Sequence, residues 1–138
     1  PLILQVALGT REFFTITGTD YPTPDGTCIR DFIHVEDLAE AHCLVLDRIE
    51  SGKGLAFNVG TGRGYSVREV LEAARRVTGH PIPSVERPRR PGDPPELVAS
   101  SDALQRFTGW KAKYPEIEAI VGTAWNWHKS HPNGYRSA

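Results

Sequence analysis

The sequence predicts an α/β fold, in which strands and helices alternate along a chain of 138 residues. Apolar residues recur at spacings of three and four in three segments, which is the pattern of amphipathic helices. Runs rich in β-branched and aromatic residues lie between these segments and predict strands. The strand-then-helix order over residues 29–78 favours strand pairing that is at least partly parallel.

The best-marked helix begins at Ser66, where Ser66-Val67-Arg68-Glu69 predicts a capping box, and it ends at Gly79. In a capping box the serine and glutamate side chains each accept a hydrogen bond from the other residue's backbone N–H. Two further helices are predicted over residues 35–49 and 115–128, and a shorter helical turn over residues 101–107.

Four strands are predicted, over residues 14–17, 29–35, 55–59 and 97–99. Residues 19–27 and 87–95 are predicted loops, because prolines remove backbone donors there and glycines permit turns. Residues 1–8 are apolar on nearly every side and resemble the last turns of a buried helix. We expect this stretch to lie inside a longer chain, since it would otherwise leave a sticky apolar helix uncovered.

Composition argues against several classes of protein. The formal net charge is −1 and the basic residues are spread along the chain, which argues against nucleic acid as a partner. No apolar run is long enough to span a bilayer. Cys28 and Cys43 have no partners at metal-ligand spacing, so reduced thiols in a cytoplasmic protein are expected. His128 and His131 alone do not predict a metal site, because zinc needs three or four ligands.

The first candidate site is the loop over residues 87–93, which reads Arg-Pro-Arg-Arg-Pro-Gly-Asp. Prolines stiffen a loop, so its arginines lose less conformational entropy when they bind. The planar guanidinium suits phosphate oxygens, and a nearby aspartate can accept hydrogen bonds from sugar hydroxyls. A solvated basic loop without a ligand is the alternative explanation.

The second candidate site is Arg30-Asp31, which interrupts the apolar alternation of a predicted strand. Either a structural Arg–Asp network or an arginine directed at a phosphate explains charges at this place. Gly60-Thr61-Gly62 imitates a dinucleotide-binding loop, but the third glycine position is Tyr65. A tight strand-to-helix connection is therefore the preferred interpretation of that loop.

Four motifs, taken in order, resemble the C-terminal part of the UDP-glucose 4-epimerases, which belong to the extended short-chain dehydrogenase/reductase superfamily. These motifs cover residues 20–35, 57–62, 88–93 and 125–135, within a resemblance that extends over essentially the whole chain. The resemblance implies a substrate-binding lobe of such an enzyme, together with the last strand and helix elements of its Rossmann-type domain. Residues 1–138 would form a single unit, with about 35–62 packed on an NAD-binding domain outside the chain.

The resemblance also implies a ligand, a UDP-sugar, while NAD is held mainly by the N-terminal domain. By matching position, Arg30 and Arg90 would grip the diphosphate and Asp93 would bind the uridine ribose. The residues implied to meet the uracil are Thr15, Ile16 and Thr17 through their backbone, and Val67 through packing.

The reaction implied for the whole protein is reversible C4 epimerisation of UDP-glucose and UDP-galactose through a keto intermediate, with NAD carrying the hydride. A cytoplasmic homodimer is implied as well. The family's Tyr-x-x-x-Lys pair is absent, because no tyrosine here has a lysine four positions on, and the glycine-rich NAD loop is absent too. We therefore expect no catalytic, cofactor-binding or metal-binding residue in this chain, and no turnover by the chain alone.

Two positions depart from patterns seen in the family. Leu97 lies where some members have a tyrosine that narrows the sugar pocket, so the shorter side chain is expected to admit N-acetylated sugars. Phe32 lies where tyrosine is also found and lacks its hydroxyl. Two alternatives stay open: another extended nucleotide-sugar dehydratase or epimerase, and a non-catalytic nucleotide-binding module. The Pro-Thr-Pro-Asp-Gly-Thr loop disfavours the first, and an upstream glycine-rich loop in the same reading frame would exclude the second.

Overall fold

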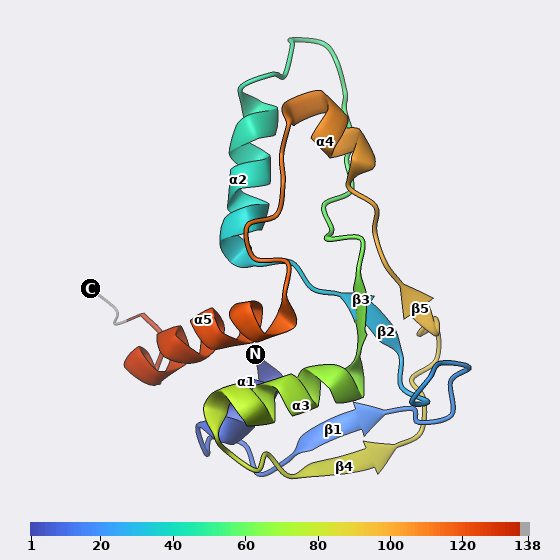
Figure 1. The fold of residues 1–138 in the computed structure, drawn as a ribbon, viewed down its shortest axis with the longest axis vertical. Helices are drawn as coiled ribbons and strands as arrows, with labels where there is room; N and C mark the ends of the chain where they lie inside the picture. Colours follow the sequence, from blue (N-terminus) through green and yellow to red (C-terminus); the bar gives the residue numbers. More distant parts are fainter. Residues whose placement is uncertain (136–138) are drawn as a thin grey trace.

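The computed structural model describes residues 1–135 of the 138. In chain order the elements are α1 (Leu2–Ala7), β1 (Phe14–Thr17), β2 (Ile29–Asp31), α2 (Val35–Leu46), β3 (Gly64–Ser66), α3 (Val67–Thr78), β4 (Ser84–Arg87), β5 (Glu96–Leu97), α4 (Asp102–Thr108) and α5 (Ile117–Ser130). Helices α1, α3 and α5 gather around the β1–β4 pair, whereas α2 and α4 lie together at the other end of the molecule (Figure 1). The predicted α/β class is confirmed.

Two small sheets organise the strands. In the first, β1 pairs in parallel with β4, with Phe14 opposite Ser84 and Thr17 opposite Arg87. In the second, the order is β3-β2-β5, where β2 runs antiparallel to β3 and parallel to β5. Parallel pairing is thus found in both sheets, but the pair formed within residues 29–78, β2 with β3, is antiparallel.

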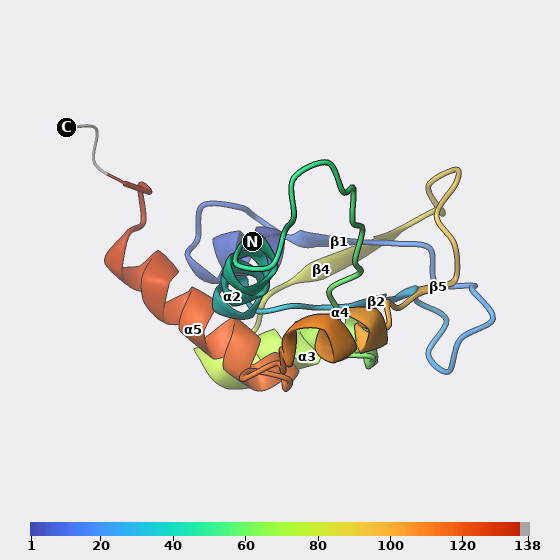
Figure 2. The same cartoon turned by 90° about the horizontal axis from the view of Figure 1, so that it is seen from above.

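Helix α3 is the central element of the larger core. Its capping box forms as predicted: Ser66 N donates to Glu69 Oε2 at 2.7 Å, and Glu69 N donates to Ser66 Oγ at 3.0 Å. Gly79 ends the helix in a left-handed conformation, with φ of 72°. The buried residues of α3 share one core with those of α1, α5 and β1, and Figure 2 shows α3 beside α5. This core buries the apolar stripe of α5, which includes Ile117, Val121 and Trp125 as the helical spacing predicts.

A second, smaller core joins α2 to α4 and consists of Ala41, Leu104 and Trp110. The buried carboxylate of Asp37 fastens this region to the connection before α5. Its two oxygens accept hydrogen bonds from the backbone N–H groups of Lys113 at 2.9 Å and Tyr114 at 3.0 Å. The Trp110 indole N–H donates to the Asp37 carbonyl at 3.0 Å.

The predicted strand over residues 29–35 is too long, because the strand stops at Asp31 and His34 caps α2. The His34 ring accepts a hydrogen bond from Glu36 N at 3.1 Å, so the chain must already turn into the helix there. The predicted strand over 55–59 is wrong for the described residues 1–135, in which this segment joins no ladder. A strand needs a neighbour for its backbone groups, and none is present beside these residues.

Other boundaries shift by a few residues. Helix α2 ends at Leu46 rather than at 49, α5 runs from Ile117 to Ser130, and the last strand covers Glu96–Leu97. Strands β3 and β4 have no counterpart in the sequence-based prediction, because both are short and lack a clear alternation of apolar and polar residues. The two predicted loops hold neither helix nor strand, apart from Arg87 at the end of β4.

Most of α1 is covered by this chain itself, so the reason given for expecting further chain around residues 1–8 does not hold. Leu4, Val6 and Ala7 are buried, because α1 packs against α3 and β1 within this chain. Leu2 stays half exposed. Among the described residues no helix combines the length and apolar character needed to cross a bilayer.

Candidate functional site

Three charged side chains predicted from the sequence converge between β2 and the proline-rich loop. Arg30 Nη2 lies 3.8 Å from Asp93 Oδ1, and Arg90 contacts the other oxygen of the same carboxylate. The Arg90 Nε and Nη2 atoms are each 3.0 Å from Asp93 Oδ2. One carboxylate therefore stands between two guanidinium groups, which leaves the trio with a net charge of about +1 at neutral pH.

The two arginines differ in exposure. The Arg30 and Asp93 side chains are only 24% and 25% exposed, whereas Arg90 is 69% exposed. Arg30 is fixed further by a hydrogen bond from its Nη1 to the Ile29 carbonyl at 2.7 Å. The trio thus offers one anchored and one freely reachable guanidinium, an arrangement suited to an anion with several oxygens.

Arg30 and Asp31 do not pair with each other, and Arg30 instead forms an ion pair with Asp93. Asp31 instead accepts a hydrogen bond from the Ala99 backbone N–H at 2.9 Å, on the segment that follows β5. Asp31 also fills the space beside Gly60, where an added Cβ would lie 2.5 Å from its Oδ2. The two neighbours therefore have separate roles: Asp31 is structural, and Arg30 is directed at Asp93.

Leu97 lies directly opposite Arg30 in the parallel β2–β5 ladder. Leu97 is 60% exposed, so it does not fill a core. The structure thus places Leu97 beside Arg30 in the ladder, and its role in limiting a sugar pocket stays a prediction.

Strand β1 brings Thr15, Ile16 and Thr17 to an open sheet edge. Phe14 N donates to the Pro83 carbonyl and Gly18 N to the Arg87 carbonyl, so the backbone groups of even-numbered residues face β4. The N–H and C=O groups of Thr15 and Thr17 consequently point away from β4, because these groups alternate along a parallel strand. Ile16 is buried in the core, so its side chain supports the strand.

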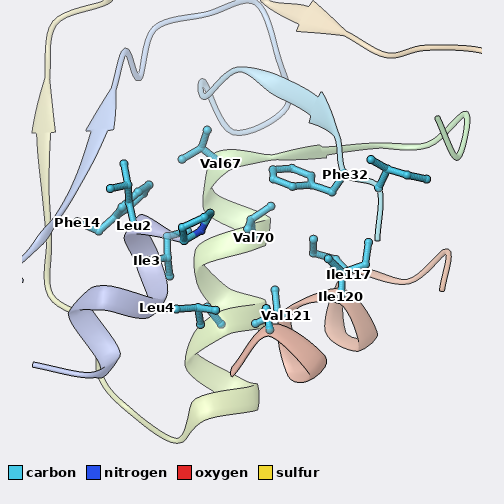
Figure 3. A pocket seen from close by; sticks show the side chains of 14 residues that line it. Leu2, Ile3, Leu4, Phe14, Phe32, Val67, Val70, Ile117, Ile120 and Val121 are labelled. Carbon is cyan, nitrogen blue, oxygen red and sulfur yellow. The ribbon is translucent and has the colours of Figure 1, made fainter. Parts of the chain in front are cut away.

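Val67, the first residue of α3, lies apart from the charged trio on the wall of an apolar cavity. The cavity has a volume of about 400 Å³, and its walls come from α1, β1, the turn before α2, α3 and α5. Figure 3 shows Val67, Phe14 and Phe32 with Val70 among the residues around it. Phe32 presents an apolar ring to this space.

Hydrogen bonds also tie the loop over residues 19–27 to the start of α3. Asp25 accepts hydrogen bonds from Thr27 N at 2.8 Å, from Thr27 Oγ1 at 2.7 Å and from the Ser66 hydroxyl. Partial burial by itself would raise the pKa of Asp25, but the hydrogen bonds from Ser66 and Thr27, with the nearby Arg68 charge, lower it below the ordinary value. Asp25 is therefore ionised at neutral pH and holds this loop in place.

The sequence interpretation missed the partner of Arg89, which it treated as one of a run of basic residues. Arg89 Nε lies 2.6 Å from Asp20 Oδ1, and its guanidinium stacks on the Tyr21 ring at 4.2 Å. An aspartate and a tyrosine, Asp20 and Tyr21, within the predicted loop over residues 19–27 were the only available signal, and nothing in the sequence pairs them with residue 89. Among residues 1–135 no cluster of three metal-ligating side chains occurs, and His131 stacks on Trp127 with 5.0 Å between ring centroids.

The sequence and the fold are similar to those of one class of enzymes. The family described as NAD dependent epimerase/dehydratase matches residues 2–60. A crystal structure of UDP-glucose 4-epimerase superposes with a TM-score of 0.92 and 52% identity, covering 99% of this chain and 42% of that chain. The fold is therefore that of the Rossmann-like epimerases and short-chain dehydrogenases/reductases.

The particular relatives are UDP-glucose 4-epimerases. The enzyme from Halalkalibacterium halodurans is 56% identical over 136 residues, which make up 98% of this chain and 41% of that protein. The enzyme from Streptomyces lividans is 55% identical over 135 residues, which make up 98% of this chain and 40% of that protein. The Bifidobacterium longum enzyme, solved in complex with NAD+ and UDP, superposes with a TM-score of 0.90 and 42% identity, covering 96% of this chain and 39% of that chain. The chain is similar to these UDP-glucose 4-epimerases over nearly its whole length and spans about two-fifths of theirs.

Proposed function

We propose that this chain is the UDP-sugar-binding part of an NAD-dependent UDP-glucose/UDP-galactose 4-epimerase. The observation that carries the proposal is the convergence of Arg30, Arg90 and Asp93 in a chain so similar to such enzymes. The Bifidobacterium longum relative was solved with UDP, the ligand that two guanidiniums beside a carboxylate are suited to hold.

In this proposal Arg30 and Arg90 bind the diphosphate. Both guanidiniums lie on Asp93, and a diphosphate brings more negative charge than one carboxylate, so it competes well for them. Asp93 then accepts hydrogen bonds from the ribose hydroxyls. It can do so because only part of its hydrogen-bonding capacity is used by the arginines.

The uracil is proposed to lie along the open edge of β1. The free N–H and C=O groups of Thr15 and Thr17 can pair with the uracil's own donor and acceptors, as a neighbouring strand would. Val67 is proposed to pack nearby, since it lies on the wall of the apolar cavity close to Phe14. A base held by backbone groups on one edge and apolar contacts on its face is bound selectively without a charged side chain.

The glycine loop that imitates a dinucleotide site does not fit the phosphates of NAD at its first glycine. Gly60 is packed against Asp31 and Ala99, which leaves no room for a phosphate beside it. We infer that the rest of the whole protein holds NAD and supplies the tyrosine and lysine of catalysis. The contribution of this chain is to bind and orient the nucleotide sugar, whereas hydride transfer depends on the NAD held by the rest of the protein.

The proposed partner surface for that NAD-binding domain covers residues 35–62. Val35, Leu46 and Leu55 on this stretch are large apolar side chains that stay exposed. The backbone over residues 54–60 makes no backbone hydrogen bond to the described part of the chain, so it is available to join a sheet. The resemblance further suggests a cytoplasmic homodimer for the whole protein, which cell fractionation and sedimentation would test.

The test is UDP binding to the 138-residue chain by calorimetry at low ionic strength. We expect micromolar-to-millimolar affinity that is lost in Arg90→Ala and kept in Arg106→Ala, a matched exposed arginine on α4. Higher salt should weaken binding, because the main contacts are ionic. Equal affinity in the two variants, or no binding by the unmodified chain, would refute the proposal that this chain carries the site.

A further inference from the structure

Two loops next to the charged trio are joined by one residue of the basic run. The first loop follows β1 and covers residues 18–27, and the second follows β4 and covers residues 88–95. Both begin at the carboxyl ends of strands that pair in parallel, so they emerge at the same edge of the sheet (Figures 1 and 2). A hollow lined by residues 18–20 and 86–89 lies between them.

Arg89 crosses from the second loop to the first with three kinds of contact. Its Nε lies 2.6 Å from Asp20 Oδ1, its Nη2 donates to the Asp20 carbonyl, and its guanidinium stacks on the Tyr21 ring at 4.2 Å. The hydrogen bond from Arg89 also lowers the pKa of Asp20, which keeps that carboxylate charged. Arg89 thus has its polar groups satisfied by the protein, in contrast to the exposed Arg90 beside it.

Two neighbouring residues are fitted to this contact. Gly18 has φ of 81°, and a Cβ there would lie 2.8 Å from Arg89 Cγ and would also collide with the Tyr21 ring. Tyr21 is 4% exposed, and its hydroxyl is the one buried side-chain polar atom without a hydrogen-bond partner among residues 1–135. The ring face, rather than the hydroxyl, is therefore the part of Tyr21 that the structure uses.

We propose that Arg89, Asp20 and Tyr21 form a clamp that positions the loop carrying Arg90 and Asp93, so that Arg89 serves ligand binding without touching the ligand. This inference rests on the proposed function for the identity of the ligand. The clamp ties the loop that carries Arg90 to the loop that follows β1. Arg90 keeps its two contacts to Asp93 and stays largely exposed. A fixed loop loses less entropy when it binds a diphosphate.

The structure supplies two matched controls. Arg87 has the same charge, lies at the end of β4, and has no hydrogen-bond or ion-pair partner for its side chain within the described residues 1–135. Arg87→Ala therefore removes one positive charge near the site without opening the clamp. Tyr21→Phe keeps the ring face and removes only a hydroxyl that has no partner, whereas Tyr21→Leu removes the aromatic face.

The first measurement is hydrogen exchange of the unliganded chain, which does not depend on the ligand. Backbone amides over residues 18–27 and 88–93 should exchange about tenfold faster in Arg89→Ala and Tyr21→Leu, because loss of the contact lets the loops open. They should exchange at the unmodified rate in Arg87→Ala and Tyr21→Phe. Unchanged exchange in Arg89→Ala would overturn the clamp, whatever the chain binds.

The second measurement is UDP affinity in the same variants. Arg89→Ala and Tyr21→Leu should weaken UDP binding about tenfold, and Tyr21→Phe should restore it, because the aromatic face is what holds Arg89. Arg87→Ala should stay close to the unmodified affinity. If Arg90→Ala abolishes binding and Arg89→Ala does not weaken it, the clamp is wrong and the proposed function stands. If Arg90→Ala has no effect while Arg89→Ala speeds exchange, the proposed function fails and the clamp stands.

Discussion

Replacing Asp37 by alanine is expected to destabilise the chain strongly, although the residue lies far from any proposed ligand contact. Asp37 is fully buried, and it accepts hydrogen bonds from Lys113 N and Tyr114 N at 2.9 and 3.0 Å. A hydrogen bond to a charged group contributes about 1.5–3 kcal/mol. The Lys113 and Tyr114 side chains are partly exposed, so water can reach the released amides in part, and the lower end applies to each. Two such bonds give an expected loss of about 3 kcal/mol in the free energy of unfolding.

Urea unfolding followed by tryptophan fluorescence measures this loss. Trp110 is a suitable reporter because it is buried and its indole N–H donates to the Asp37 carbonyl. Asp37→Asn keeps one oxygen acceptor and should lose about half as much. Asp47→Ala, an exposed carboxylate at the end of the same helix, should change stability by less than about 0.5 kcal/mol. If Asp37→Ala unfolds at the same urea concentration and with the same slope as Asp47→Ala, the proposed role of the two hydrogen bonds is wrong.

Three further predictions concern the site and its surroundings. Asp25→Asn should make the stability of the fold less sensitive to acid. The folded pKa of Asp25 lies below its ordinary value of 3.8, so its stabilisation is present above pH 3.8 and is lost as the pH falls through the folded value. Thermal unfolding at several pH values measures this loss, with Ser66→Ala as a companion variant. Asp93→Asn should bind inorganic pyrophosphate more tightly, because both arginines lose a competing carboxylate. The same variant should bind UDP more weakly, because Asp93 is proposed to bind the ribose. Calorimetry with both ligands would contradict the ribose role if both affinities rise. Leu97→Tyr should weaken binding of a UDP-N-acetylhexosamine several-fold more than binding of UDP-galactose, and equal effects on the two ligands would eliminate Leu97 as a gate.

Local chemistry made α3 predictable. The capping box of Ser66 and Glu69, the apolar stripe and the final Gly79 all lie within the single segment 66–79, and the structure has each of them. The end of the strand at Asp31 was harder to predict. It depends on His34 acting as a helix cap through its ring, which the apolar character of the neighbouring residues conceals.

Contacts between distant segments account for what the sequence could not predict. Strand β4 is a strand because it lies beside β1, and its own residues, Ser84–Arg87, carry almost no strand pattern. The segment over residues 55–59 is the reverse case, since it carries a strong strand pattern but has no neighbour among residues 1–135. In both segments the presence or absence of a neighbouring strand, rather than the β-propensity of the residues, therefore decides whether a strand forms.

The basic loop shows why residue type alone could not separate structural from binding arginines. Arg89 and Arg90 are adjacent and identical in chemistry, yet the first is bound to Asp20 and Tyr21, and the second reaches into solvent beside Asp93. Surface ion pairs by themselves hold a loop weakly. Arg89 adds a contact of another kind, because its guanidinium stacks on the ring of the buried Tyr21. The prolines limit the loop's own freedom, and Arg89 ties it to the loop that follows β1, so Arg90 can stay exposed while the loop is held in place. Two adjacent arginines in a stiff loop can thus have different roles, with Arg89 holding the loop and Arg90 free to contact a ligand. Only the partner of each side chain in the structure shows which arginine has which role.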